Sequence, residues 1–130
     1  MINESNLESA LMKSWIRETS SDPSNWNEQN PSWGQCAVTS LVVNDYLGGE
    51  IIWANAKLPD GRDLSHYFNK VNGIEKDFTR KQFPAGTVIP AGIPKTKLFF
   101  STRDYVLSYD LTRQRYERLK IKVQDALKRS

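Results

Sequence analysis

The sequence predicts a small α+β domain, and three observations support this prediction. Apolar residues recur at helical spacing over residues 5–19, 35–47 and 110–128. Residues 50–79 instead read as short strands separated by turn signals. The whole chain has 130 residues, which is the size of one domain. We therefore expect a single domain over residues 1–130, in which helices pack on an antiparallel sheet.

The first predicted helix covers residues 5–19. Leu7, Leu11 and Trp15 recur every four residues and give this segment one apolar stripe. Residues 20–33 follow as a polar loop that contains two tryptophans. A loop of this length in a small domain is usually functional or is packed down by its own side chains.

The second predicted helix covers residues 35–47 and is expected to be buried. Val38, Leu41 and Val42 lie on a mostly apolar face, and few polar residues occupy the rest of the helix. Gly48-Gly49 follows directly, and glycine is common at the carboxyl end of helices.

Three strands are predicted to form an antiparallel meander, over residues 50–55, 65–71 and 74–79. Asn72-Gly73 is a strong signal for a two-residue hairpin turn, in which Val71 pairs with Ile74. Counting back from this pair places His66 and Asp77 on the same face of the sheet, as diagonal neighbours. The remaining elements are an irregular connection over 83–94, a short helix over 102–108 and a long basic helix over 110–128.

Cys36 is the only cysteine and His66 the only histidine in the chain. A thiolate is stabilised by the positive end of a helix dipole and by a nearby imidazolium, and Cys36 lies where the second helix is expected to begin. Asp77 lies within reach of His66 to orient its ring. A thiol, an imidazole and a carboxylate in this order predict the catalytic residues of a thiol hydrolase or acyltransferase.

Two further residues near Cys36 are candidates for substrate contacts. The backbone amide of Cys36 is free to donate to an oxyanion, and Gln35 is a candidate second donor; Asn30 and Gln29 are weaker candidates. Trp33 either lines a substrate groove or packs against the second helix.

The order of these residues resembles the core of the papain-like superfamily, above all its transglutaminase-type and cell-wall amidase branches. Residues 34–39, 66–69 and 77–83 also resemble the YunG-like family of small bacterial proteins, and this similarity continues to residues 115–119. Asn30 departs from the papain pattern, in which a glutamine lies six residues before the cysteine.

The resemblance implies a papain-like core: an N-terminal helix, a buried helix bearing the cysteine and packed on the meander, and a long C-terminal helix. It implies that Cys36 is the nucleophile, His66 the general base and Asp77 the orienting acid. The substrate would be a peptide or another amide-bearing molecule, or a thioester, and the family brings no known substrate. The alternative is a non-catalytic binding module with the same fold.

Composition argues against several other classes of protein. One histidine and one cysteine cannot fill a zinc site without at least two carboxylates, so we expect no metal and no cofactor. The net charge of +3 is too small to indicate nucleic-acid binding, although a binder using the basic C-terminal helix remains a third hypothesis. No apolar run is long enough to span a membrane, and no secretion signal is evident, so we expect a cytoplasmic protein. The sequence does not indicate an oligomeric state.

Overall fold

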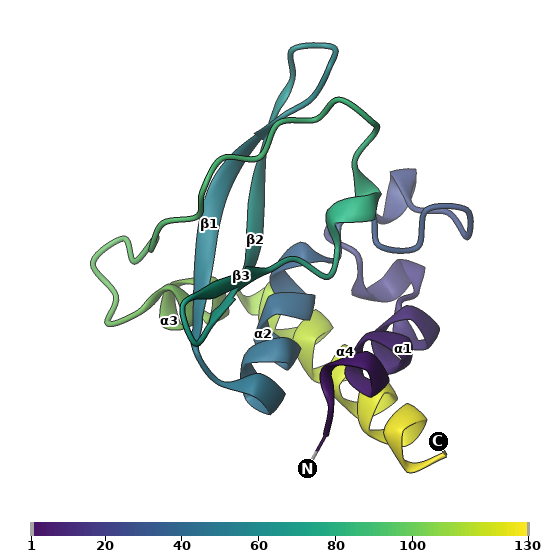
Figure 1. Ribbon diagram of the computed structural model, residues 1–130. Helices are drawn as coiled ribbons and strands as arrows, with labels where there is room; N and C mark the ends of the chain where they lie inside the picture. The colour runs from purple at the N-terminus through teal and green to yellow at the C-terminus, as the bar shows by residue number, and fades with distance from the viewer. Residues whose placement is uncertain (1, 130) are drawn as a thin grey trace.

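The computed structural model describes residues 2–129. It confirms the predicted α+β class, with helices packed on a three-stranded antiparallel sheet (Figure 1). The α-helices of the described residues are α1 (Glu4–Ser14), α2 (Cys36–Leu47), α3 (Thr102–Leu107) and α4 (Asp110–Lys128). The strands are β1 (Glu50–Lys57), β2 (Asp63–Val71) and β3 (Ile74–Lys76). Short 3₁₀ turns are η1 (Arg17–Thr19), η2 (Pro23–Asn25) and η3 (Arg80–Gln82).

The core lies around α2, which packs against β2 on one side and against α4 on the other. Helix α1 closes the core by packing on α4. The buried apolar side chains come mainly from α1, α2 and α4, with Ile51 from β1, and include Leu7, Leu11, Val38, Leu41, Val42, Val43, Ile51, Leu119 and Val123. The burial of Val38, Leu41 and Val42 confirms that α2 is a buried helix.

Helix α1 is shorter than predicted, because it ends at Ser14 and not at residue 19. Trp15 adopts an extended conformation, and its indole N–H donates to the hydroxyl of Thr39 on α2, at 2.9 Å. This buried contact turns the chain toward α2, so that Arg17–Thr19 forms a separate turn.

The predicted register of the β2–β3 hairpin is confirmed, with Val71 paired to Ile74. Asn72 has a φ of 53°, as a tight hairpin turn requires. The predicted extent of the third strand is wrong, because β3 stops at Lys76 rather than at residue 79. The carboxylate of Asp77 accepts a hydrogen bond from the backbone N–H of Thr79, at 3.2 Å, and this local turn takes the chain out of the sheet.

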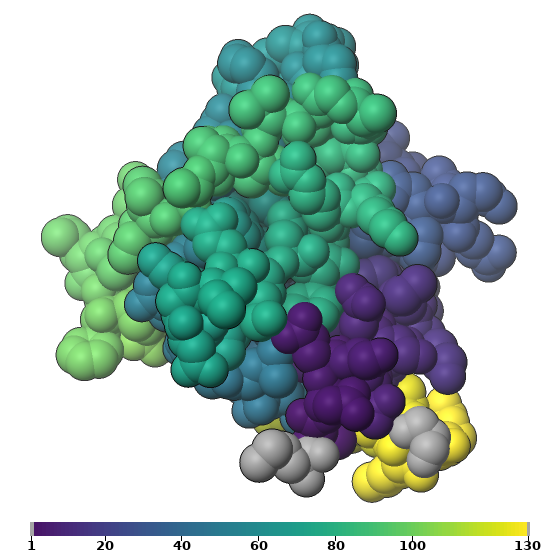
Figure 2. Space-filling view, in the orientation of Figure 1, coloured from purple at the N-terminus to yellow at the C-terminus, as the bar shows by residue number. Residues whose placement is uncertain are grey.

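The connection after β3 returns along the outer edge of β1. Backbone bridges join Lys57 to Val88 and Trp53 to Ile93, so this edge of the sheet does not stay unpaired. Figure 2 shows the same connection spread over the front of the molecule, between α1 and the loop that precedes α3.

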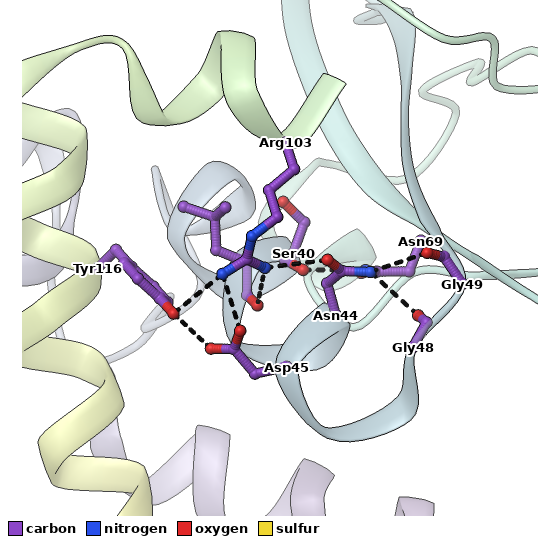
Figure 3. Close-up of polar contacts among 9 residues, drawn as sticks. Ser40, Asn44, Asp45, Gly48, Gly49, Asn69, Arg103 and Tyr116 are labelled. Atoms are coloured by element: carbon purple, nitrogen blue, oxygen red, sulfur yellow. Dashed lines mark hydrogen bonds and ion pairs between the residues drawn. The ribbon is translucent and has the colours of Figure 1, made fainter. Parts of the chain in front are cut away.

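The carboxyl-terminal half of α2 is anchored by a polar network centred on Arg103 of α3 (Figure 3). The guanidinium donates to Asn44 at 2.9 Å, to Asp45 at 2.8 Å and to the hydroxyl of Tyr116 on α4 at 3.2 Å. Tyr116 in turn donates to Asp45. These contacts join three helices at one end of α2 and leave its other end, where Cys36 lies, outside the network.

Helix α4 has the predicted bounds, but its apolar stripe is partly different. Tyr116, Leu119 and Val123 are buried as predicted, whereas Leu111 is exposed and Ala126 takes part in the core instead. Within residues 2–129, none of the helices combines the length and the hydropathy needed to cross a membrane.

Candidate functional site

Cys36 is the first residue of α2, as its sequence position predicts. No side chain caps the helix, so its first-turn amides are left free of an N-cap hydrogen bond. The thiol therefore lies at the positive end of the dipole of a 12-residue helix. The side chain of Cys36 is partly exposed.

The loop before Cys36 is held in place by hydrogen bonds to its own backbone. Ser20 donates from its hydroxyl to the carbonyl of Trp33 at 2.8 Å, and the N–H of Ser21 donates to the carbonyl of Gly34 at 2.9 Å. Gly34 has a φ of 72°, a conformation that glycine adopts without steric cost. Its N–H donates to the side-chain carbonyl of Gln82 at 3.1 Å.

Gln82 connects this loop to the residues around Asp77. Its Nε2 donates to the hydroxyl of Thr79 at 3.0 Å, and the N–H of Thr79 donates to the carboxylate of Asp77. A continuous chain of hydrogen bonds thus leads from the residues preceding Cys36 to the predicted acid. This series of hydrogen bonds fixes the start of α2 and the carboxylate of Asp77 relative to each other.

His66 lies on β2 and is fully buried. Its Nε2 and the Oδ2 of Asp77 are 2.6 Å apart, so the carboxylate orients the ring. Phe68 stacks on the ring at a centroid distance of 5.3 Å, and Phe83 contacts it edge-on at 5.0 Å. The other ring nitrogen, Nδ1, is buried and has no hydrogen-bond partner among the described residues.

Two neighbours determine the charge of the His66 ring. Burial alone lowers the pKa of an imidazole, because it disfavours the charged form. The hydrogen bond to Asp77 and the interaction with the Cys36 thiol outweigh this effect and raise the pKa of His66 to about 9. The ring is therefore an imidazolium at neutral pH, and the thiol of Cys36 is close enough to interact with it.

A cleft of about 340 Å³ gives access to Cys36. Cys36 and Ala37 line it from the start of α2, and Ser65 and Tyr67 line it from β2. His66 is not among the lining residues, since it alternates with Ser65 and Tyr67 along the strand and points to the other face. The cleft is thus lined by the cysteine and not by the imidazole.

The opposite wall of the cleft comes from the segment around α3. Tyr105 and Tyr109 lie on this wall, with their hydroxyl groups 3.0 Å apart. Lys95 also lines the cleft, and its Nζ lies 4.2 Å from the centre of the Trp53 ring. These residues were not identified from the sequence. No helical spacing rule relates the two tyrosines, because Tyr105 lies on α3 and Tyr109 lies just before α4.

Gln35 and Trp33, the two other predicted site residues, do not line the cleft. Gln35 is fully buried, and its Nε2 donates to the carbonyl of Ile16 at 2.9 Å, while its Oε1 is buried without a hydrogen-bond partner in the described chain. The indole N–H of Trp33 donates to the carboxylate of Asp22 at 3.0 Å. The structure thus brings Cys36 together with His66 and the acid, and it leaves these two residues in the loop behind the helix.

Comparison with known proteins identifies the family of this chain. The family model described as YunG protein matches residues 3–128. The chain belongs to the YunG family. It is 41% identical over 75 residues to the uncharacterized protein YunG of Bacillus subtilis (strain 168), a match that covers 58% of each protein. No solved structure matches the chain.

Membership of the YunG family confirms the resemblance to the YunG-like family that the sequence showed. The family name carries no activity, so the chemistry has to be argued from the site itself. Within residues 2–129, no group of three or more His, Cys, Asp or Glu side chains is arranged to hold a metal ion. The titratable groups that come together near the start of α2 in this YunG-family chain are the thiol, the imidazole and the carboxylate.

The raised pKa of His66 can be measured directly, since this histidine is the only one in the chain. We expect NMR titration of its imidazole to show a midpoint near 9. In Asp77→Asn the midpoint should fall by more than one pH unit, because burial then acts without the opposing carboxylate. Asp63→Asn removes an exposed carboxylate from the same strand and should leave the midpoint unchanged. Equal midpoints in the wild type and Asp77→Asn would contradict this account.

Proposed function

We propose that this YunG-family protein is a cysteine-dependent acyl-transfer enzyme that uses Cys36, His66 and Asp77. One observation carries the proposal: a partly exposed thiol at a helix start interacts with a buried imidazole, whose far nitrogen is 2.6 Å from a carboxylate. The raised pKa of His66 supports a thiolate–imidazolium pair at neutral pH. The cleft over the sulfur supplies space for an acyl group.

The reaction would proceed through a thioester on Cys36. The thiolate attacks the carbonyl carbon of an amide or thioester and forms a carbon–sulfur bond, and the carbonyl oxygen becomes an oxyanion. As the intermediate collapses, the bond to the leaving group breaks, and an amine leaving group takes its proton from the His66 imidazolium. Water or another acceptor then gives its proton to His66, attacks the thioester and releases the thiolate. Hydrolysis and acyl transfer share every step and differ only in the molecule that attacks the thioester.

The oxyanion is assigned to amide donors at the start of α2. The N–H of Cys36 belongs to the first helical turn, whose amides have no partner within the helix. The predicted second donor, Gln35, takes no part in this assignment, because its side chain is fully buried, bonds to Ile16 and does not line the cleft. The predicted substrate contact of Trp33 would require a substrate that extends beyond the cleft.

The papain-like core is part of the same proposal. A helix that starts with the nucleophile and packs on the strand bearing the histidine supports it. The substrate would be a peptide or another amide-bearing molecule, and a free thiol fits a reducing, cytoplasmic setting. No nucleic-acid or membrane partner is proposed.

One observation favours the alternative of a non-catalytic binding module. His66 is completely covered by protein, and a buried histidine bonded to a carboxylate also serves as a packed structural group. In that case the cleft would bind a ligand, and Cys36 would behave as an ordinary thiol.

Alkylation of the single cysteine with iodoacetamide, followed by mass spectrometry of the intact protein, distinguishes the two functions. We expect Cys36 to react at pH 6 almost as fast as at pH 8.5, although an ordinary thiol with a pKa near 8.5 is almost entirely protonated at pH 6. His66→Gln should slow the reaction at pH 6 by at least about tenfold, since the imidazolium no longer stabilises the thiolate.

The pH dependence of Cys36 alkylation, measured in control variants, distinguishes loss of the thiolate–imidazolium pair from unfolding of the protein. Asp63→Asn, a remote exposed change on β2, should retain the wild-type profile. A thermal melt of His66→Gln shows whether the variant remains folded at the labelling temperature. A wild-type profile that follows an ordinary thiol, or that is unaltered in a folded His66→Gln variant, would support the binding module instead.

A further inference from the structure

The cleft at Cys36 is lined by a cationic side chain and by no carboxylate among the described residues. Lys95 is the one lysine or arginine among the described residues that line it, and no aspartate or glutamate is among them. No carboxylate among residues 2–129 forms a salt bridge with Lys95. A cation with no salt-bridge partner in the described part of the chain thus lines the same cleft as the thiol.

Lys95 is held at the cleft by contacts on both its backbone and its side chain. Its N–H donates to the hydroxyl of Thr102 at 2.9 Å, which fixes the chain just before α3. Its ammonium group lies over the Trp53 ring, and such cation–π contacts restrain a lysine without neutralising its charge. Trp53 is the cross-strand partner of Tyr67, so the ammonium lies beside the strand that lines the cleft.

Apart from Cys36, whose proposed thiolate is paired with the His66 imidazolium, the other polar groups of the cleft are hydroxyls, which can donate hydrogen bonds to a ligand. Burial raises the pKa of Tyr67, and the hydrogen bond to Tyr109 raises the pKa of Tyr105, so both phenols stay protonated. Ser65 adds a further hydroxyl. An ammonium, hydroxyl donors and the positive end of α2 together make an environment that suits an anion.

We propose that the cleft selects amide or thioester substrates with a negatively charged group close to the acyl carbon, such as an acidic peptide, and that Lys95 confers this preference. The proposal rests on the acyl-transfer function inferred for Cys36. It adds the class of substrate, which the thiol, imidazole and carboxylate do not determine. A neutral or cationic acyl group would leave the ammonium unpaired, whereas an anionic group would pair with it in a partly desolvated site.

Two small alkylating reagents of different charge test this preference without a known substrate. Iodoacetate is anionic and iodoacetamide is neutral, and both alkylate the thiolate of Cys36. The measured quantity is the ratio of their second-order rate constants at pH 7 and low ionic strength. We expect Lys95→Met to lower the iodoacetate-to-iodoacetamide ratio by about threefold to fivefold, the effect of one charge at a few ångströms in a solvated cleft. Lys95→Glu should lower it further, and 0.5 M salt should reduce both differences.

Matched variants separate a local effect from one of overall charge. Lys95→Arg keeps the charge and should retain the wild-type ratio. Lys13→Glu makes the same change in net charge as Lys95→Glu on the exposed surface of α1, and it should leave the ratio unchanged. A thermal melt of each Lys95 variant confirms that the protein is folded during labelling.

The outcomes distinguish the two proposals. Fast alkylation at pH 6 with a ratio insensitive to Lys95 would overturn the anionic substrate class and leave acyl transfer standing. Equal shifts in Lys95→Glu and Lys13→Glu would overturn it as well, because the effect would then come from overall charge. Alkylation that follows an ordinary thiol in the wild type would instead remove the acyl-transfer function on which the inference rests.

Discussion

Gly34→Ala is expected to destabilise the protein by about 3–6 kcal/mol and to abolish the fast alkylation of Cys36. A Cβ at this position would overlap the hydroxyl of Ser20 and would lie 3.1 Å from the backbone nitrogens of Ser21 and Asp22. The φ of 72° costs an alanine about 1–2 kcal/mol, and overpacking adds about 1–3 kcal/mol. Ser20 would also lose its hydrogen bond to Trp33, which contributes about 1 kcal/mol. Urea unfolding at pH 7 measures the loss.

The loss of reactivity follows from what Gly34 connects. Its N–H bonds to Gln82, and that bond begins the path to Thr79 and Asp77. A displaced loop would separate the thiol from the imidazole even in molecules that remain folded. Gly61→Ala is the matched control, since Gly61 has a φ of 93° and a Cβ there would meet nothing within 4 Å. If both variants lost the same stability, the close contact at Gly34 would not be the cause.

Arg103→Met is expected to lower the free energy of unfolding by about 2–3 kcal/mol. The guanidinium bonds to Asp45, Asn44, Tyr116 and the carbonyl of Leu41, and its removal would leave a partly buried carboxylate without its cation. Removing one partner of a fully buried pair costs about 3–5 kcal/mol, and partial exposure here reduces that figure. Methionine retains most of the aliphatic stem, so the lost charge and hydrogen bonds dominate the measurement.

Arg113→Met provides the comparison for Arg103. Arg113 pairs with Asp110 at 2.8 Å on the exposed surface of α4, and such pairs contribute less than about 1 kcal/mol. Urea unfolding of both variants should give clearly different losses. The Arg103 network lies at the opposite end of α2 from Cys36, so folded Arg103→Met should retain the pH profile of alkylation. Comparable stability losses in the two variants would show that the network does not anchor the helices.

Local sequence patterns were sufficient to predict the helices and the hairpin in which those patterns are strong. The hairpin at Asn72-Gly73 was predicted with its register, because a two-residue turn fixes which residues pair. The bounds of α4 were also predicted from periodicity and flanking residues, and the start of α2 was predicted to within one residue of Cys36. The contact between His66 and Asp77 followed from counting along the hairpin.

Local rules failed where a side chain from elsewhere in the sequence decided the conformation. The end of α1 depends on the contact between Trp15 and Thr39, which are 24 residues apart. The link from Gly34 to Gln82 spans 48 residues, and no spacing rule relates them. Gln35 illustrates the same limit, since its side chain bonds to Ile16 instead of lining the cleft.

The sequence by itself determined the α+β class, the hairpin register, the thiol at a helix start and the placement of His66 next to Asp77. These features depend on neighbours within a few residues or on the count across one turn. Only the tertiary structure decided that the imidazole is fully buried, that Gln82 joins the helix start to the acid, and that Lys95, Tyr105 and Tyr109 line the cleft at the thiol. Those features depend on packing between distant segments, where burial and shape rather than local backbone preference select the partners.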